Sequence, residues 1–291
     1  MTLRFGTDGV RGVANRDLTP ELVTALGRAA ARVLGADRPF VVGRDTRRSG
    51  PLLEAALVAG LCSEGADVER VGVLPTPGVA YLAQMFDTPA AVLSASHNPY
   101  PDNGVKLFAR GGRKIADAPE EQIETELRRL VDAGAGDGPE GPGVGVVRDR
   151  LGGAADYIAH LSAALGDRRL DGQSVVVDCG NGAAFEVAPW ALRVRGAWVR
   201  VLHDEPDGTN INAGCGSTTA ASSDSGRPRR AITSSSNMPV SVPSPVVARS
   251  ARITCPDCSP PRDRPRSSSA VSTLRSPTGV STTSMPCSAS A

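Results

Sequence analysis

The sequence predicts an α/β protein: a mixed, largely parallel sheet sandwiched by helices, followed by an incomplete second α/β domain. Short apolar runs such as Pro39–Val42 and Ala90–Leu93 alternate with helical patterns, and this alternation is typical of parallel sheets with both faces covered. The 291 residues also suffice for about two domains. We expect a first domain over residues 1–147, a partial second domain over 148–218 and a tail over 219–291.

Charge and cysteine content exclude several classes of function. The formal net charge of +1 combines +6 in residues 219–291, which hold nine Arg against three Asp, with −5 in the rest. This balance argues against a dominant nucleic-acid or membrane partner. No apolar run reaches the roughly 18 residues of a membrane span, and Met1–Gly6 lacks a signal-peptide core. Six cysteines without a framework spacing predict reduced thiols in a cytoplasmic protein.

Helix and strand signals follow one another through the first domain. Thr19 is a preferred N-cap residue, Pro20 suits the first helical position, and Glu21 favours the positive end of a helix. An apolar stripe continues this helix to Leu34. Further along, the patterns predict helices over 51–63, 79–85 and 118–133, and strands over 39–42, 67–73, 90–93 and 105–108.

The second domain repeats the alternation after a glycine-rich stretch, Gly134–Gly143, which predicts a flexible connection. The turn Gly180–Gly182 follows a predicted strand, as a dinucleotide-binding turn does, but the third glycine of that fingerprint is missing, which argues against a NAD site. The patterns predict helices over 154–165 and from 184 to 193, and strands over 174–178 and 198–202.

The composition changes abruptly after Thr218. Residues 219–291 contain 19 Ser and 10 Pro but no Phe, Tyr or Trp. Such a segment cannot bury enough apolar surface to offset its chain entropy, so we expect disorder. The abrupt change also fits a frame-shifted reading of a longer gene. Cys255 and Cys258 have metal-like spacing without a second pair of ligands, and we interpret them as a chance pair.

One loop, Leu93–Lys106, concentrates most of the reactive groups. It holds two serine hydroxyls, an imidazole, two amides and an ammonium group within fourteen residues. Strand-like runs lead into and out of it, while Asn98-Pro99 and Asn103-Gly104 are turn signals. We therefore expect the polar groups on a connection between two strands, where catalytic residues are common. From spacing alone, a hydrophilic turn with an idle serine fits equally well.

A second loop, Phe5–Gly12, combines three glycines with Arg11. Glycines let backbone N–H groups approach an anion, and a guanidinium offers a fixed fork of donors for phosphate. The glycine spacing is also common in ordinary surface turns.

A third loop, Gly43–Gly50, follows a predicted strand, as Ser96 does. The carboxyl ends of parallel strands border one crevice, so we expect Arg44 and Ser96 in the same crevice. For Arg47 and Arg48, a solvated basic turn is the favoured interpretation.

Four stretches together resemble the α-D-phosphohexomutase family, and within it the bacterial phosphoglucosamine mutases. The Ser-Ala-Ser-His-Asn-Pro stretch is highly specific for the superfamily, whereas the first and last stretches favour the glucosamine enzymes over phosphoglucomutases and phosphomannomutases. The resemblance covers residues 3–218 and rests on Phe5–Gly12, Gly43–Arg47, Ser94–Pro99 with Asn103–Lys106, and Asp207–Thr218.

This resemblance implies that Ser96 carries a phosphoryl group. The implied reaction interconverts glucosamine 6-phosphate and glucosamine 1-phosphate through a bound glucosamine 1,6-bisphosphate, on the way to UDP-N-acetylglucosamine and cell-wall precursors. It implies one Mg²⁺ per active site, contacted in this chain through the phosphate on Ser96. Phosphoryl transfer depends on in-line placement and on neutralising charge. The implied partner is a small phosphosugar, with no nucleic acid and no membrane; the oligomeric state is left open.

The resemblance also assigns roles to single residues. Ser96 is the phosphoryl carrier, and Arg11 and Lys106 are cations that assist proton transfer or hold the transferred group. His97 either orients the serine or satisfies the turn. Ser94 and Asn98 shape the loop. Phosphate or substrate binding is expected for Thr7, Arg44, Asn98 and Asn103.

The sequence departs from the family after Thr218. The Asp-rich metal loop, the sugar-recognition loop and the C-terminal phosphate-binding loop of the family have no counterpart in it. We therefore expect a truncated, inactive form of the enzyme. The alternatives are a phosphomannomutase or phosphoglucomutase of the same superfamily, or a non-catalytic phosphosugar-binding fragment.

Overall fold

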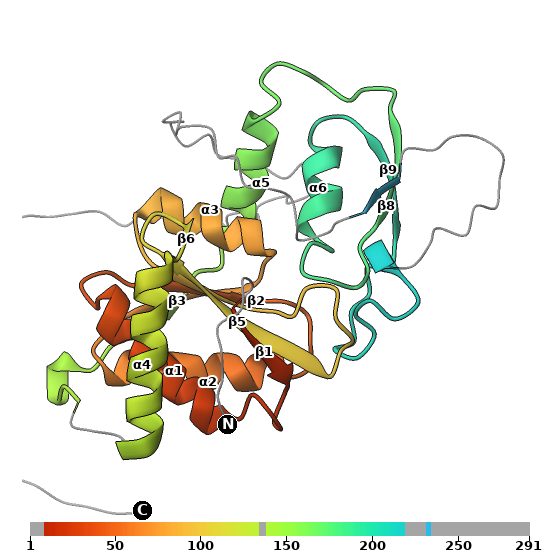
Figure 1. Ribbon diagram of the computed structural model, residues 1–291. Helices are drawn as coiled ribbons and strands as arrows, with labels where there is room; N and C mark the ends of the chain where they lie inside the picture. The colour runs from red at the N-terminus through yellow and green to blue at the C-terminus, as the bar shows by residue number, and fades with distance from the viewer. Residues whose placement is uncertain (1–8, 134–137, 219–230, 234–291) are drawn as a thin grey trace, which may run out of the picture. The chain divides into compact units, whose positions relative to one another are not determined.

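A computed structural model describes residues 9–133, 138–218 and 231–233 of the chain. The predictions of disorder or a frame shift concern residues 219–291, nearly all of which lie outside these ranges. Residues 231–233 form a short strand that pairs with residues 176–178, so the prediction of disorder is wrong for these three. The described residues contain two β-sheets with helices around them (Figure 1). The predicted class, a mixed and largely parallel sheet sandwiched by helices, is confirmed.

The first sheet has seven strands in the order β1-β5-β4-β2-β3-β7, with β6 paired to β5. The adjacent pairs β4–β2, β2–β3 and β3–β7 are parallel. Strand β5 runs antiparallel to both β1 and β4. The strands are β1 Val10–Val13, β2 Phe40–Arg44, β3 Val68–Val73, β4 Ala90–Leu93, β5 Asp102–Ala109, β6 Arg113–Lys114 and β7 Val147–Asp149.

Helices cover both faces of this sheet. Residues alternate between the faces along a strand: Phe40 and Val42 of β2 join the core under α1, α2 and α4, whereas Val41 joins the core under α3. Figure 1 shows α3 on one side of the sheet and the other three helices on the opposite side. The helices are α1 Pro20–Leu34, α2 Gly50–Ser63, α3 Thr76–Phe86 and α4 Asp117–Ala133.

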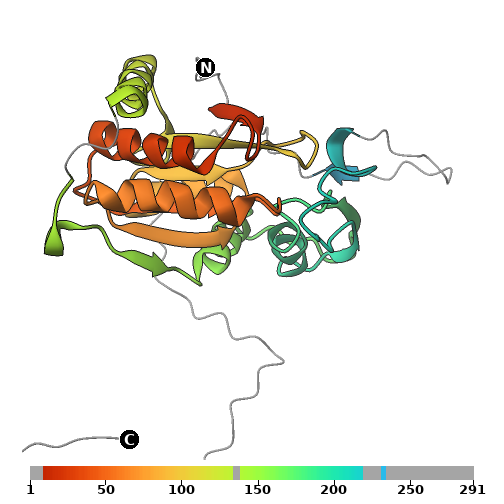
Figure 2. The ribbon, with the colours of Figure 1, turned by 90° about the horizontal axis from the view of Figure 1, so that it is seen from below.

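The start of α1 matches its sequence signals. Thr19 has an extended backbone and its side chain accepts a hydrogen bond from the Leu22 N–H, while Pro20 occupies the first turn. Helices α1 and α2 run side by side in Figure 2. They approach closely because Gly27 and Gly60 lack side chains: a Cβ at either position would overlap the backbone of the other helix.

The predicted turn at Asn103-Gly104 is wrong, because both residues lie inside β5. They pair with Gly12 and Arg11 of β1, a strand where the sequence predicts a loop. The Asn103 side chain is buried and donates to the Ser49 hydroxyl at 2.9 Å. Pairing with a distant strand and a buried partner therefore overrides the local turn preference.

The second sheet is parallel and has the order β10-β8-β9. Its predicted strands over 174–178 and 198–202 are confirmed. Val187 of α6 and Tyr157 of α5 join the core under α3. The remaining elements are α5 Gly153–Ala163, β8 Ser174–Asp178, α6 Val187–Arg193, β9 Trp198–Leu202, β10 Ala231–Thr233 and the short 3-10 helices Gly141–Gly143 and Gly216–Thr218.

The expected boundary between residues 147 and 148 falls within β7. This strand pairs with β3 of the first sheet, so the division into two domains stays a prediction. Residues 134–137 of the expected connection lie outside the described part. None of the described helices combines the length and apolar character that crossing a membrane requires.

Candidate active site around Ser96

Ser96 lies in the loop between β4 and β5, three residues past the end of β4. Its backbone has a φ of +55°, in the left-handed region that favours glycine. The Ser96 N–H donates to the Ser94 Oγ at 3.0 Å, and this hydroxyl donates to Asp45 Oδ2 at 2.7 Å. The predicted loop-shaping role of Ser94 is thus confirmed. A serine in this conformation needs such surrounding contacts to keep it there.

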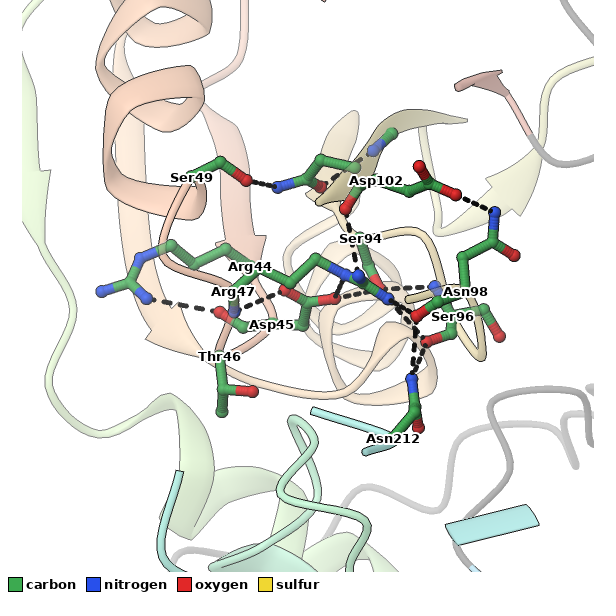
Figure 3. Close-up of polar contacts among 12 residues, drawn as sticks. Arg44, Asp45, Thr46, Arg47, Ser49, Ser94, Ser96, Asn98, Asp102 and Asn212 are labelled. Atoms are coloured by element: carbon green, nitrogen blue, oxygen red, sulfur yellow. Dashed lines mark hydrogen bonds and ion pairs between the residues drawn. The ribbon is translucent and has the colours of Figure 1, made fainter. Parts of the chain in front are cut away.

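The carbonyl oxygen of Ser96 is held as well. It accepts hydrogen bonds from Arg47 Nη2 and from Asn212 Nδ2, both at 3.0 Å. The same two side chains donate to the carbonyl of Asn98, at 2.8 and 3.2 Å respectively. Figure 3 shows how these groups converge below the loop.

Arg47 is completely buried, so the interpretation as a solvated basic turn is wrong for this residue. Its Nε donates to Asp45 Oδ2 at 2.9 Å, and the Asp45 Oδ1 accepts from the Arg47 backbone N–H at 3.0 Å. A buried charge of this kind is tolerated only when it is paired and hydrogen-bonded. The two Nη atoms donate to four backbone carbonyls of the loop, those of Ser96, Asn98, Pro99 and Asp102.

Arg44 does not join this group. Its Nε lies 3.4 Å from Glu54 Oε2 on α2, and Nη1 donates to the Asp45 carbonyl. Burial raises the pKa of Glu54, and the neighbouring Arg44 opposes that shift. Figure 3 shows the Arg44 guanidinium pointing away from Ser96. Contact of Arg44 with a phosphate therefore stays a prediction. Arg48 is exposed, as expected.

Arg11 and Lys106 project from the same face of the first sheet. Arg11 of β1 lies opposite Gly104 of β5, and Lys106 follows two residues later on β5. Positions two apart on a strand share a face, and cross-strand partners do too. Lys106 is also paired with Val92 of β4, the strand that leads to Ser96. The sheet thus places Lys106 on β5, a strand that borders this loop, and Arg11 on β1, the neighbour of β5.

The other predicted site residues have different surroundings. His97 is exposed on the loop. Asn98 donates through Nδ2 to Asp102 Oδ2 at 2.9 Å, a contact within the loop. The side-chain oxygen of Asn103 accepts from the Gly104 N–H at 2.8 Å. The catalytic role of His97 and substrate binding by Asn98 and Asn103 stay predictions, and Thr7 lies outside the described residues.

The described residues do not supply a Mg²⁺ site. Across residues 9–133, 138–218 and 231–233, no three His, Cys, Asp or Glu side chains gather closely enough to hold a metal ion. Mg²⁺ requires near-octahedral oxygen ligation. A Mg²⁺ ion bound to a phosphate on Ser96 would therefore have no set of carboxylate ligands among the described residues.

Loops of the second sheet contact the Ser96 region at several points. The Thr46 hydroxyl donates to the Asn181 carbonyl, the Arg48 N–H donates to the Gly208 carbonyl at 2.8 Å, and Asn212 reaches Ser96. Sequence reasoning missed Asn212 and the roles of Asp45 and Arg47. A hint was present, since Asp45 and Arg47 lie two residues apart directly after a strand, yet that spacing does not distinguish an exposed pair from a buried one.

Comparison with known proteins finds one family model and a set of curated relatives that resemble this chain. Residues 2–132 match the family model of phosphoglucomutase/phosphomannomutase, alpha/beta/alpha domain I. The chain is 54% identical over 224 residues to the phosphoglucosamine mutase of Mycolicibacterium gilvum, and 56% identical over 226 residues to that of Salinispora arenicola. Each alignment covers 75% of this chain and 49% of the relative.

A solved structure shows the same similarity. A phosphoglucomutase/phosphomannomutase family protein from Burkholderia thailandensis superposes with a TM-score of 0.59 at 30% identity, over 73% of this chain and 46% of that one. The chain thus spans about half the length of the curated relatives it matches.

Proposed function

Because this chain belongs to the phosphohexomutases, with phosphoglucosamine mutases among its relatives, we propose that it carries the phosphoserine half of a phosphoglucosamine mutase active site. The substrate is a phosphosugar, glucosamine 6-phosphate or glucosamine 1-phosphate, and Ser96 is the phosphoryl carrier. The observation that supports this most directly is the conformation of Ser96. It is a strained, half-buried serine held at both its N–H and its carbonyl, beside strands that carry Arg11 and Lys106.

In the proposed step, Ser96 Oγ attacks one phosphorus of glucosamine 1,6-bisphosphate. The Oγ–P bond forms as the bond between phosphorus and the sugar oxygen breaks, and the hydroxyl proton of Ser96 passes to the departing sugar oxygen. The products are phosphoserine and a sugar monophosphate, and the reverse step regenerates the bisphosphate. Arg11 and Lys106 neutralise charge on the transferred group, which is the main demand of such a transfer.

The proposed transfer step uses residues of this chain and the bisphosphate only. The family resemblance implies one Mg²⁺ per active site, yet the described residues bring no acidic cluster to hold it. We therefore propose that the 291-residue chain takes up a phosphoryl group on Ser96 without completing mutase turnover. We also propose that it acts in the cytoplasm, because cysteines without a framework spacing favour reduced thiols.

The test uses the purified 291-residue chain, incubated with glucosamine 1,6-bisphosphate and Mg²⁺. Intact-mass spectrometry should detect one added phosphoryl group, which peptide mapping should place on Ser96. Ser96→Ala should abolish the addition, and Ser217→Ala, at an exposed serine outside the site, should leave it unchanged. A chain that gains no phosphoryl group, or gains it elsewhere, would refute the proposed function.

A coupled mutase assay separates the alternatives. We expect no conversion of glucosamine 6-phosphate above the rate of the Ser96→Ala chain. Turnover comparable with that of a full-length relative would show that the chain is a complete catalyst. Phosphosugar binding that survives Ser96→Ala, without phosphoryl transfer, would instead favour a binding fragment. A preference for mannose or glucose phosphates would favour the sister activities.

A further inference from the structure

We propose that Arg47 is a positioning residue for phosphoryl transfer: together with Asp45 it locks the backbone of Ser96 and so sets the direction of the reacting hydroxyl. This inference rests on the proposed phosphoryl transfer at Ser96. It concerns a side chain that the described structure buries completely and that does not face a substrate.

Every N–H donor of the Arg47 side chain meets an acceptor within the protein. A guanidinium carries five N–H groups in a planar fork. In Arg47 one of them meets Asp45 and the other four meet backbone carbonyls, all five acceptors lying within the protein. The four carbonyls belong to residues 96–102, the loop that carries the reacting serine. Lysine has three donors on a flexible stem and cannot satisfy this set.

The N–H and the carbonyl of Ser96 both connect to one ion pair, that of Arg47 with Asp45. The carbonyl of Ser96 accepts from Arg47, whereas its N–H reaches Asp45 through the Ser94 hydroxyl. Asp45 in turn accepts from Arg47 Nε at 2.9 Å. The directions of the N–H and the carbonyl depend on φ and ψ, so this closed circuit restrains both angles of Ser96.

The backbone conformation of Ser96 determines where its hydroxyl lies. Ser96 has a φ of +55°, which an L-residue leaves for negative φ unless neighbouring contacts prevent it. The direction of the Cα–Cβ bond changes with that rotation, and Oγ moves with it. Phosphoryl transfer requires in-line placement of the attacking oxygen, and displacements of about 1 Å reduce such rates by up to about a hundredfold.

The same contacts exclude the simpler idea that Arg47 binds phosphate. All its donors are used by the protein, its side chain is completely buried, and its charge is paired with Asp45. Arg47 therefore acts through the backbone of Ser96, whereas Arg11 and Lys106 act on the transferred group.

The experiment measures the rate of Ser96 phosphorylation in the full chain as the concentration of glucosamine 1,6-bisphosphate is varied. In Arg47→Lys we expect the maximal rate to fall at least about tenfold, with little change in the half-saturating concentration. The matched control is Arg48→Lys at the exposed neighbour, which should keep the wild-type rate. Urea unfolding of both variants shows whether each is folded under the assay conditions.

Hydrogen exchange supplies a readout that does not depend on chemistry. Amides of residues 94–102 should exchange faster in Arg47→Lys than in the wild type, while those of α1 should not change. Wild-type rates in Arg47→Lys, or slower transfer with unchanged loop exchange, would overturn the positioning role. A wild-type chain that is never phosphorylated would instead refute the proposed function itself. If Arg47→Lys proves unfolded, Ser94→Ala, which breaks the same circuit at one hydroxyl, takes its place with the same two expected results.

Discussion

At the scale of single residues, Gly104 shows how closely the site is packed. It lies on β5 opposite Arg11. A Cβ at Gly104 would lie 2.8 Å from the Ser94 carbonyl oxygen, 2.9 Å from Arg11 Cγ and 3.0 Å from the Val10 carbonyl oxygen. Two of these neighbours are backbone atoms that cannot rotate away. The absence of a side chain at Gly104 is what allows β1 and the Ser96 loop to meet β5.

We therefore predict that Gly104→Ala lowers the free energy of unfolding by about 2 kcal/mol, because the strands must separate to admit the methyl group. Chemical denaturation in urea measures the change. Gly152→Ala is the matched control: a Cβ at Gly152 has no neighbour within 4 Å, so it should cost less than about 1 kcal/mol. Equal losses in the two variants would show that the overlap at Gly104 is relieved at no cost.

For single residues of the site, the sequence predicted some roles and not others. Ser96 could be singled out because its motif is specific. The burial of Arg47 could not be deduced, because four of its five acceptors are carbonyls of residues about fifty positions away. Backbone carbonyls exist in every residue, so the sequence carries no mark of which ones a guanidinium will meet.

At the scale of elements, an ion-pair network joins three helices of the first sheet. Glu64, directly after α2, pairs with Arg28 and Arg32 of α1, and Arg32 pairs with Glu126 of α4. The Glu64 side chain is 9% exposed and the Arg28 side chain 8%. Burial by itself would raise the pKa of Glu64, but hydrogen bonds from Arg32 and Arg28 outweigh it and hold that pKa below 4.5.

A carboxylate with a lowered pKa contributes stability above its ordinary pKa of 4.5, and this contribution is lost as pH falls through the lowered value. Glu64→Gln should therefore cost about 3 kcal/mol at neutral pH, since it leaves buried Arg28 without its charge partner. The gap between wild type and variant should narrow as the pH is lowered below 4.5. Urea unfolding at several pH values measures it.

The matched control for this network is Glu121→Gln on an exposed position of α4. It should change stability little at any pH. A gap between wild type and Glu64→Gln that stays constant down to about pH 2 would contradict the assignment of the pH dependence to Glu64.

Elements were largely predictable where one local signal decided them. The capped start of α1 and the strands β4, β8 and β9 follow from periodicity and flanking turns. The strand β1 did not, because its residues read as a glycine-rich loop until β5 pairs with them. The N-terminal half of β5 was not predicted for the same reason: its residues look like a turn until β1 pairs with them.

At the scale of the whole molecule, the two sheets differ in how much they bury. Among the described residues, the first sheet has a core on each face, whereas the part around the second sheet has few large buried aliphatic side chains, chiefly Val177, Val187 and Ile211. Within the described residues, β9 is an edge strand, and Trp190 and Trp198 are 51% and 64% exposed. Exposed aromatic surface contributes little to stability. The sequence alone indicated an incomplete second unit, but the burial of each side chain depended on the three-dimensional arrangement.

We predict that the second sheet opens more readily than the first. Amide exchange of β8, the middle strand of the small sheet, should be at least about tenfold faster than that of β2, a central strand of the large one. Both strands have hydrogen-bonded neighbours on either side, so the comparison is not biased by an open edge. The reason is the smaller apolar surface that unfolding of β8 exposes.

Equal exchange rates in β8 and β2 would contradict this prediction and show one cooperative unit. In such a unit, the contacts of Asn181, Gly208 and Asn212 with the Ser96 region would couple the two sheets. Asn212→Gly, which keeps the positive φ of 58° available while removing the amide, would then distinguish coupling through that contact from intrinsic stability, because only coupling makes β8 exchange faster in the variant.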